Sequence, residues 1–154
     1  MDEFEPDDAV VIGGPVSRLS VSVRIAGDTL DPAEITRRFG VTPKFAASKG
    51  DQVKRGHRTV TQRSGIWTYR LTGEGSADRE LDDAIVALLA RLPDDSTMWR
   101  ELAQRFTIDV FCGLFMGSEN QVADLRPSTL ALLAERGLAL GLDIYGPPPF
   151  EAAT

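Results

Sequence analysis

The alternation of apolar and polar residues is clearest between residues 19 and 26. Every second position there is aliphatic and the positions between are polar: the aliphatic set is Leu19, Val21, Val23 and Ile25, and the polar set is Ser20, Ser22 and Arg24. Successive side chains of a strand point to opposite faces of its sheet. This period of two therefore predicts a strand in a sheet that is covered on one face only.

A helix is predicted to follow this strand, over residues 31–39. Asp31 suits the N-cap position and Pro32 suits the first helical position. Glu34 is placed to complete a capping box by reaching back to the start of the helix. Gly40 is typical of a helix end, so the pattern predicts both ends of this element.

The chain between residues 42 and 71 is polar and rich in Lys and Arg. Its part at residues 58–63 is predicted to pair, across Ser64 and Gly65, with a strand at residues 66–71. The rest of the chain predicts five more elements by periodicity: helices at 78–92, 97–105 and 127–136, and strands at 106–116 and 138–145.

Several positions in these later elements have a predicted side. Asp82 and Asp83 are expected on the solvent face of their helix, whereas Leu130 and Leu133 are expected to face the core. The strand at 106–116 is apolar at both parities, which is typical of a strand near the middle of a sheet.

Strands that alternate with helices yet keep a polar face favour an α+β fold, a two-layer sandwich with a mostly antiparallel sheet and helices on one face. The stretches 19–40 and 106–137 both contain a strand, a loop and a Pro-led helix that ends at Gly. We therefore expect a ferredoxin-like arrangement of two strand-helix-strand halves. The single domain is predicted to span residues 17–146, between an acidic tail (1–16) and a Pro-rich tail (147–154).

Composition narrows the class of protein. The chain has 154 residues, and its hydrophobic fraction of 42% is enough for one core without metals or disulfides. Cys112 lies among apolar residues and is predicted to be buried, which fits a reducing compartment. The acidic start and the lack of a long apolar run predict a cytoplasmic protein outside the membrane. The net charge of −6 disfavours nucleic acid as a partner.

The predicted open face places chemistry-bearing residues together. Arg24 belongs to it, and Asp109, Asp143, Phe111 and Tyr145 occupy the polar parities of the later strands. A guanidinium beside two carboxylates can bind a polar ligand, or the carboxylates can share a proton, because like charges held close separate in pKa. Two plainer interpretations stay open: an arginine that bridges two acids, and a homodimer interface formed by the exposed rings.

A second cluster is basic. It contains one acid, Asp51, and six cations: Lys44, Lys49, Lys54, Arg55, Arg58 and Arg63. This local reversal of charge can attract phosphate or an acidic partner, with Trp67 available for stacking. A solvated loop beside a buried Trp67 is the alternative. His57 is interpreted as a residue of this loop.

No metal site or cofactor is predicted. One histidine and one cysteine are too few for a zinc or iron site. The acids Asp28, Asp31 and Glu34 are better explained by a turn and a helix cap than by calcium. The glycine pairs lack the sequence context of a phosphate-binding loop.

Several short segments, taken in order, resemble the bacterial domain-of-unknown-function family DUF4279. They span residues 19–145 and are Val23–Asp28, Leu30–Ile35, Gly40–Pro43, Lys49–Asp51, Ile66–Trp67 and Leu142–Tyr145. The resemblance implies a bacterial single-domain α+β protein and carries over no catalytic residue. It directs attention to Lys49, Asp51 and Trp67 as binding residues, with a turn at Gly50 and a core position for Trp67 as the alternative.

These observations favour a non-enzymatic protein-interaction or ligand-binding module, of the immunity or adaptor kind, acting through a protein partner or a second copy of the chain. Two alternatives stay open. One is a small-molecule sensor or enzyme that uses Arg24, Asp109 and Asp143 on the open face. The other is phosphate or nucleic-acid binding through the basic loop at residues 44–63.

Overall fold

The computed structural model describes residues 14–72 and 80–149. Within them the elements follow one another in this order: β1 (Arg18–Gly27), α1 (Pro32–Phe39), β2 (Phe45–Ala47), β3 (Gln52–Arg55), β4 (Arg58–Thr61), β5 (Gly65–Arg70), α2 (Leu81–Ala90), α3 (Ser96–Arg105), β6 (Thr107–Phe115), α4 (Pro127–Glu135) and β7 (Ala139–Tyr145). This succession confirms the α+β class.

The main sheet has the strand order β2-β5-β1-β6-β7. Its pairings are antiparallel except for β6 with β7, which run parallel, so the sheet is mostly antiparallel as predicted. The ferredoxin-like arrangement of two equal halves is not confirmed. After α1 the chain enters β2, which is separated from β1 by β5, whereas after α4 it enters β7, directly beside β6.

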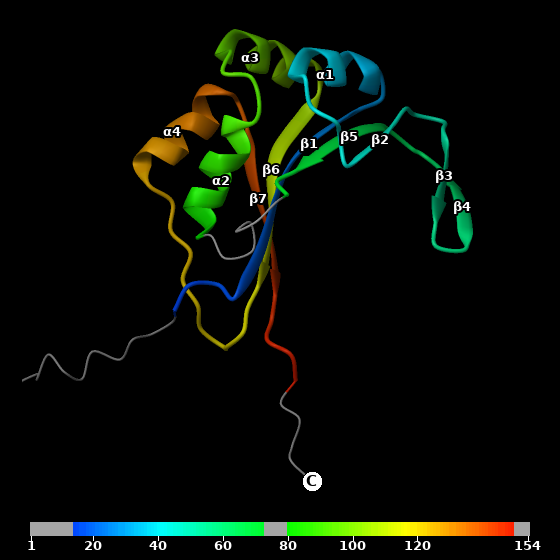
Figure 1. The fold of residues 1–154 in the computed structure, drawn as a ribbon. Coiled ribbons are helices and arrows are strands. Elements are labelled where there is room, and N and C mark those ends of the chain that lie inside the picture. The colour runs from blue at the N-terminus through cyan, green and yellow to red at the C-terminus, as the bar shows by residue number, and fades with distance from the viewer. Residues whose placement is uncertain (1–13, 73–79, 150–154) are drawn as a thin grey trace, which may run out of the picture.

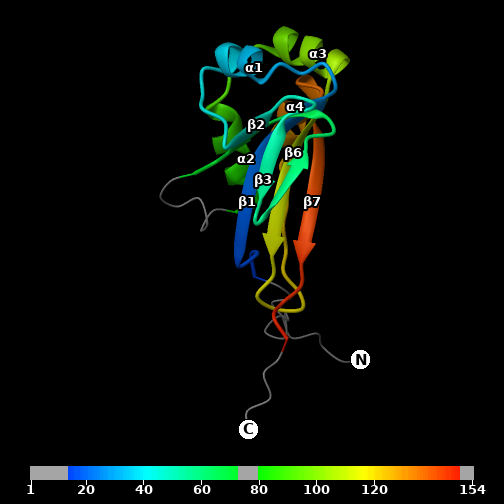
Figure 2. The ribbon, with the colours of Figure 1, turned by 90° about the vertical axis from the view of Figure 1, so that its right-hand side faces the viewer.

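The helices lie on one side of the sheet and at one end of it. Figure 1 shows α2 and α4 against one face, and α1 and α3 across the upper end. The alternate residues of β1 that were predicted to be covered are buried on that side: Leu19, Val21, Val23 and Ile25. They form one core with buried residues of α2 and α3, including Ile85, Leu88 and Trp99. The opposite face carries no helix among the described residues (Figure 2).

The start of α1 differs from its predicted capping box. Asp31 caps the helix, because its side chain accepts a hydrogen bond from the Ala33 amide at 3.0 Å. Glu34 does not reach back to the cap; its carboxylate binds Arg105 of α3 and Arg38. At the other end Gly40 adopts a positive φ of 70°, as a helix-ending glycine is expected to do.

The basic stretch forms a separate hairpin and not the one predicted. Strand β4 pairs with β3, and β5 pairs with β1 and β2, so residues 58–63 do not pair with residues 66–71. The sequence pattern missed β3 because it is short and polar. Gly56, with a φ of 62°, makes the turn between β3 and β4.

Two predicted sides are also corrected. Asp82 is buried rather than solvent-facing: its carboxylate accepts hydrogen bonds from the backbone N–H of Arg126 at 2.7 Å and from its Nε at 2.6 Å. Leu130 is 49% exposed, whereas Leu133 is buried as predicted. A helix pattern gives no warning of Asp82, because its partner lies in a distant loop.

The chain ends are described only in part. Residues 1–13 and 150–154, which hold most of the two predicted tails, lie outside the described residues. Pro15 forms a β-bridge with Val122, and Val16 packs against the core. In the part of the chain that the structure describes, no helix is both long and apolar enough to cross a membrane.

Candidate functional site

The open face of the sheet is built around the central pair β1 and β6. Their register places Arg24 opposite Asp109. The guanidinium donates two hydrogen bonds to that carboxylate, from Nε to Oδ1 at 2.9 Å and from a terminal nitrogen to Oδ2 at 2.5 Å. It also lies 3.9 Å from the centre of the Phe111 ring. These contacts hold the side chain in place, and the hydrogen bond to Asp109 raises the pKa of Arg24 despite partial burial.

A hollow lies beside this ion pair. It has a volume of about 270 Å³ and is lined by Arg24, Ala26, Ile66, Thr107 and Asp109. The Arg24 side chain is 39% exposed and that of Asp109 is 19% exposed, so both can contact a bound group. Ligand pockets usually start at roughly 300 Å³, so this hollow suits one side chain or a small polar group.

Asp143 lies at the other end of the same face. It is paired with Gly113, four residues further along β6 than Asp109, which separates the two carboxylates by roughly 13 Å at the usual rise of a strand. Asp143 instead accepts a hydrogen bond from the Tyr145 hydroxyl at 2.6 Å. The predicted cluster of Arg24 with two carboxylates therefore forms with Asp109 alone.

Aromatic stacking orders this lower end of the open face. The rings of Tyr145 and Phe115 are stacked at 4.6 Å with an angle of 5° between their planes. Arg18 places its guanidinium 4.2 Å from the centre of the Phe115 ring. The hydrogen bond to Asp143, together with the charge of that carboxylate, raises the pKa of Tyr145. Both ends of the face thus repeat one motif, an arginine stacked on a phenylalanine.

The hairpin β3–β4 stands in front of the upper end of this face. Figure 1 shows it on the side away from the helices, and Figure 2 shows it overlying the sheet. Arg55 lies 5.7 Å from the centre of the Phe45 ring on β2. The exposed cations of the hairpin and its flank form no ion pair within the described residues: they are Lys54, Arg55, Arg58 and Arg63.

The Lys49-Gly50-Asp51 segment forms a turn at the base of that hairpin. Asp51 accepts a hydrogen bond from the Ser48 amide at 2.9 Å, and Gly50 has a φ of 91°. Lys49 bonds to Asp28 at 2.8 Å, which lowers the pKa of that carboxyl. Both predicted binding residues are therefore engaged in holding the turn, although Lys49 and Asp51 are exposed.

Trp67 lies in the core and is not available for stacking. Its side chain is fully buried on the helix side of β5, and its indole N–H donates to the Thr36 hydroxyl at 3.0 Å. The Phe39 ring meets it edge-on at 5.2 Å. The alternative of a core position, open at the level of sequence, is the one that the structure supports.

Comparison with known proteins supplies the family. The model of the family described as a domain of unknown function, DUF4279, matches residues 17–147. The chain belongs to the DUF4279 family. No curated protein and no solved structure matches it. Family membership thus covers β1 to β7 but brings no activity, and the DUF4279 domain has to be interpreted from its own geometry.

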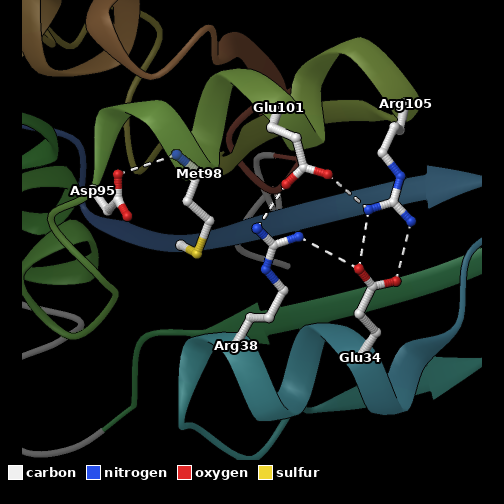
Figure 3. A network of polar contacts seen from close by, with 6 residues as sticks. All are labelled: Glu34, Arg38, Asp95, Met98, Glu101 and Arg105. Atoms are coloured by element: carbon white, nitrogen blue, oxygen red, sulfur yellow. Dashed lines mark hydrogen bonds and ion pairs between the residues drawn. The ribbon is translucent and has the colours of Figure 1, made fainter.

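A polar network missed by the sequence patterns joins α1 to α3 in this DUF4279 domain (Figure 3). Glu34 and Glu101 alternate with Arg38 and Arg105, and Arg38 bonds to Glu101 at 2.6 Å while Arg105 bonds to Glu34 at 3.0 Å. These bonds lower the pKa of both carboxyls and raise that of both guanidinium groups. Each of these four charged groups has an oppositely charged partner, so the network is best explained as a structural link between α1 and α3.

Other reactive groups of the domain are also accounted for. Cys112 is buried in β6, and desolvation, with a smaller contribution from the Asp109 charge, raises the pKa of its thiol to about 12. A thiol with that pKa stays protonated and unreactive near neutral pH. Within residues 14–72 and 80–149 no three His, Cys, Asp or Glu side chains gather as a metal site. The open face with its hairpin is therefore the candidate site.

Proposed function

We propose that this protein is a non-enzymatic binding module whose basic hairpin and upper open face receive an acidic segment of a protein partner. The observation that carries this is the uncompensated positive charge beside a hollow. Residues 52–72 contain no acid, and they hold five cations in a chain of net charge −6: Lys54, Arg55, Arg58, Arg63 and Arg70.

The charge pattern favours an acidic partner because it opposes the charge of the whole chain. A local positive field on an acidic protein attracts a negative segment to one place and repels it elsewhere. The hollow then offers a specific contact: the exposed part of Arg24 can pair with a carboxylate, while Ile66 contacts its aliphatic stem. Stacking on Phe111 keeps Arg24 in place before binding, which lowers the cost of ordering it.

A binding measurement tests this proposal. The probe is a fluorescein-labelled polyglutamate peptide, followed by anisotropy at low salt. The double variant Arg55→Glu/Arg58→Glu is expected to bind about tenfold more weakly or worse, because like charges then face each other. Its control is Arg37→Glu/Arg91→Glu, which changes the net charge equally at exposed positions on α1 and after α2. An equal loss of affinity in both variants would show that binding depends only on net charge, and it would contradict the proposal.

The same titration separates the alternatives. Single-stranded DNA and inorganic polyphosphate use the same cations, so tighter binding of either than of polyglutamate would favour phosphate recognition. Trp67 is buried in the core and offers no stacking platform to a base beside these cations. A small molecule held by Arg24 and Asp109 is favoured only by the hollow itself. We also propose a cytoplasmic location, supported by the unpaired Cys112.

A further inference from the structure

The two edges of the main sheet differ in how they are protected. The edge at β2 is only three residues long, and the chain leaves it for the β3–β4 hairpin. The edge at β7 is seven residues long, is the last strand in the sheet order, and contains neither Lys nor Pro. Figure 2 shows β7 as the outermost strand on its side. Long, apolar edges of this kind are templates for pairing with another strand.

The residues of β7 whose backbone N–H and C=O groups point to the free edge are its large aliphatic residues. The Tyr145 carbonyl accepts from the Met116 amide, so Tyr145 directs its backbone groups inward along the sheet. Backbone groups alternate in direction along a strand, so Leu140, Leu142 and Ile144 direct theirs to the free edge. Leu142 and Ile144 are 49% and 58% exposed. The residues that offer unpaired backbone groups at this edge therefore also carry exposed aliphatic side chains.

We propose that β7 pairs antiparallel with β7 of a second copy of this chain, about a two-fold axis at Leu142. In this register Leu142 faces Leu142 of the second copy, and Leu140 faces Ile144, so every outward residue meets an outward residue. About six backbone hydrogen bonds form, two for each such pair. The two five-stranded sheets join into one of ten strands.

Charge disfavours the neighbouring register on the carboxyl side. Asp143 lies opposite Gly141 of the second copy, which has no side chain to oppose it. A shift of one residue toward the carboxyl end would place Asp143 opposite Asp143, and like charges directly across a strand pair destabilise it. Because the two-fold axis is perpendicular to the sheet, both open faces lie on the same side. The dimer would then present two copies of the proposed binding surface together, although the pairing does not depend on that function.

The mass in solution and amide exchange test this pairing. Light scattering of the full chain is expected to give twice 16.8 kDa at micromolar concentration. Leu142→Lys is expected to give a monomer, and the control Leu130→Lys, at a leucine of equal 49% exposure on α4, is expected to stay dimeric. Hydrogen exchange at the amides of Leu142 and Ile144 should slow as concentration rises. Far-UV circular dichroism checks that each variant is folded.

Two results would overturn the proposal. One is a monomer at every concentration up to several hundred micromolar. The other is a dimer that persists in Leu142→Lys with no concentration-dependent protection of the edge amides; this second result would assign the contact to the open face or another surface. Loss of polyglutamate binding in the hairpin variant leaves the dimer unaffected, so the two proposals fail separately.

Discussion

The two faces of the main sheet are ordered by different forces. On the helix side the residues of β1 and β6 are aliphatic and buried, and burying each such side chain contributes roughly 1.5–3 kcal/mol. On the open side two arginines lie on two phenylalanine rings, and one of them is also paired with Asp109. Exposed ion pairs contribute only about 0–1 kcal/mol. The helix face therefore stabilises the fold, whereas the open face keeps polar groups in fixed positions within reach of water.

The difference matters for function because fixed, accessible charge is what a binding surface needs. Arg24 is stacked and hydrogen-bonded, yet 39% of its side chain is exposed. A buried residue of the helix face, by contrast, is not accessible to a binding partner. Substitutions on the two faces should therefore separate stability from binding.

Truncating an aromatic residue on each face gives the largest expected contrast. Trp67→Ala removes a fully buried ring and its hydrogen bond to Thr36, and we expect it to lower the free energy of unfolding by about 3–5 kcal/mol. Phe111→Ala removes a half-buried ring of the open face, and we expect roughly half that loss. Urea denaturation followed by circular dichroism measures both. Equal losses would show that the open face stabilises the fold as strongly as the core.

A buried acid on the helix side gives the next contrast. Burial acts to raise the pKa of Asp82, but the hydrogen bonds that its carboxylate accepts from the backbone and the side chain of Arg126 outweigh it and leave the pKa lowered. A carboxyl whose folded pKa is depressed stabilises the fold above its unfolded pKa and loses that contribution as pH falls through the folded value. We expect Asp82→Asn to cost about 1–3 kcal/mol at pH 7.

The acid limb of the stability curve checks the cause. The free energy of unfolding of the wild type should fall as pH drops below about 4, and the Asp82→Asn variant should fall less steeply there. Asp109→Asn on the open face is the matched control, and it should cost at most about 1 kcal/mol at pH 7 because its ion pair is partly exposed. Parallel acid limbs in the wild type and Asp82→Asn would rule out this role for Asp82.

The sequence patterns predicted the features that depend on residues close together in the chain. The alternation at 19–26 gave β1 and its buried side, and the Asp31 and Gly40 signals gave both ends of α1. The open face followed from β1 alone, since one polar parity predicts one uncovered face. Arg24 and Asp109 could be assigned to the same face, but their pairing depends on the register between β1 and β6, which no local pattern contains.

The errors arose where partners are distant in sequence. Glu34 was expected to cap its own helix, but Arg105 of α3 supplies a stronger partner. Asp82 was expected on a solvent face, but it is buried because it is hydrogen-bonded to Arg126, forty-four residues later. In the basic stretch, the short polar strand β3 has no apolar alternation, so residues 58–63 were paired with the wrong neighbour.

The smallest expected effect is a titration on the open face. The hydrogen bond to Asp143 and the charge of that carboxylate raise the pKa of Tyr145. A raised pKa means that the folded state holds the phenolic proton more tightly, so the contribution to stability is present below the unfolded pKa and is lost as pH rises through the folded value. In a Tyr69→Phe background Tyr145 is the single tyrosine of the chain, because there are two in all.

Ultraviolet absorbance of tyrosinate then follows Tyr145 alone. Adding Asp143→Asn should move the transition to lower pH, because the amide carries no negative charge to oppose ionisation. Asp124→Asn removes the same charge at an exposed position outside the open face and should leave the transition in place. Equal shifts in both variants would mean that overall charge, and not the 2.6 Å bond, sets the pKa of Tyr145. A shift with Asp143→Asn alone would show that the hydrogen bond between Tyr145 and Asp143 is present in solution.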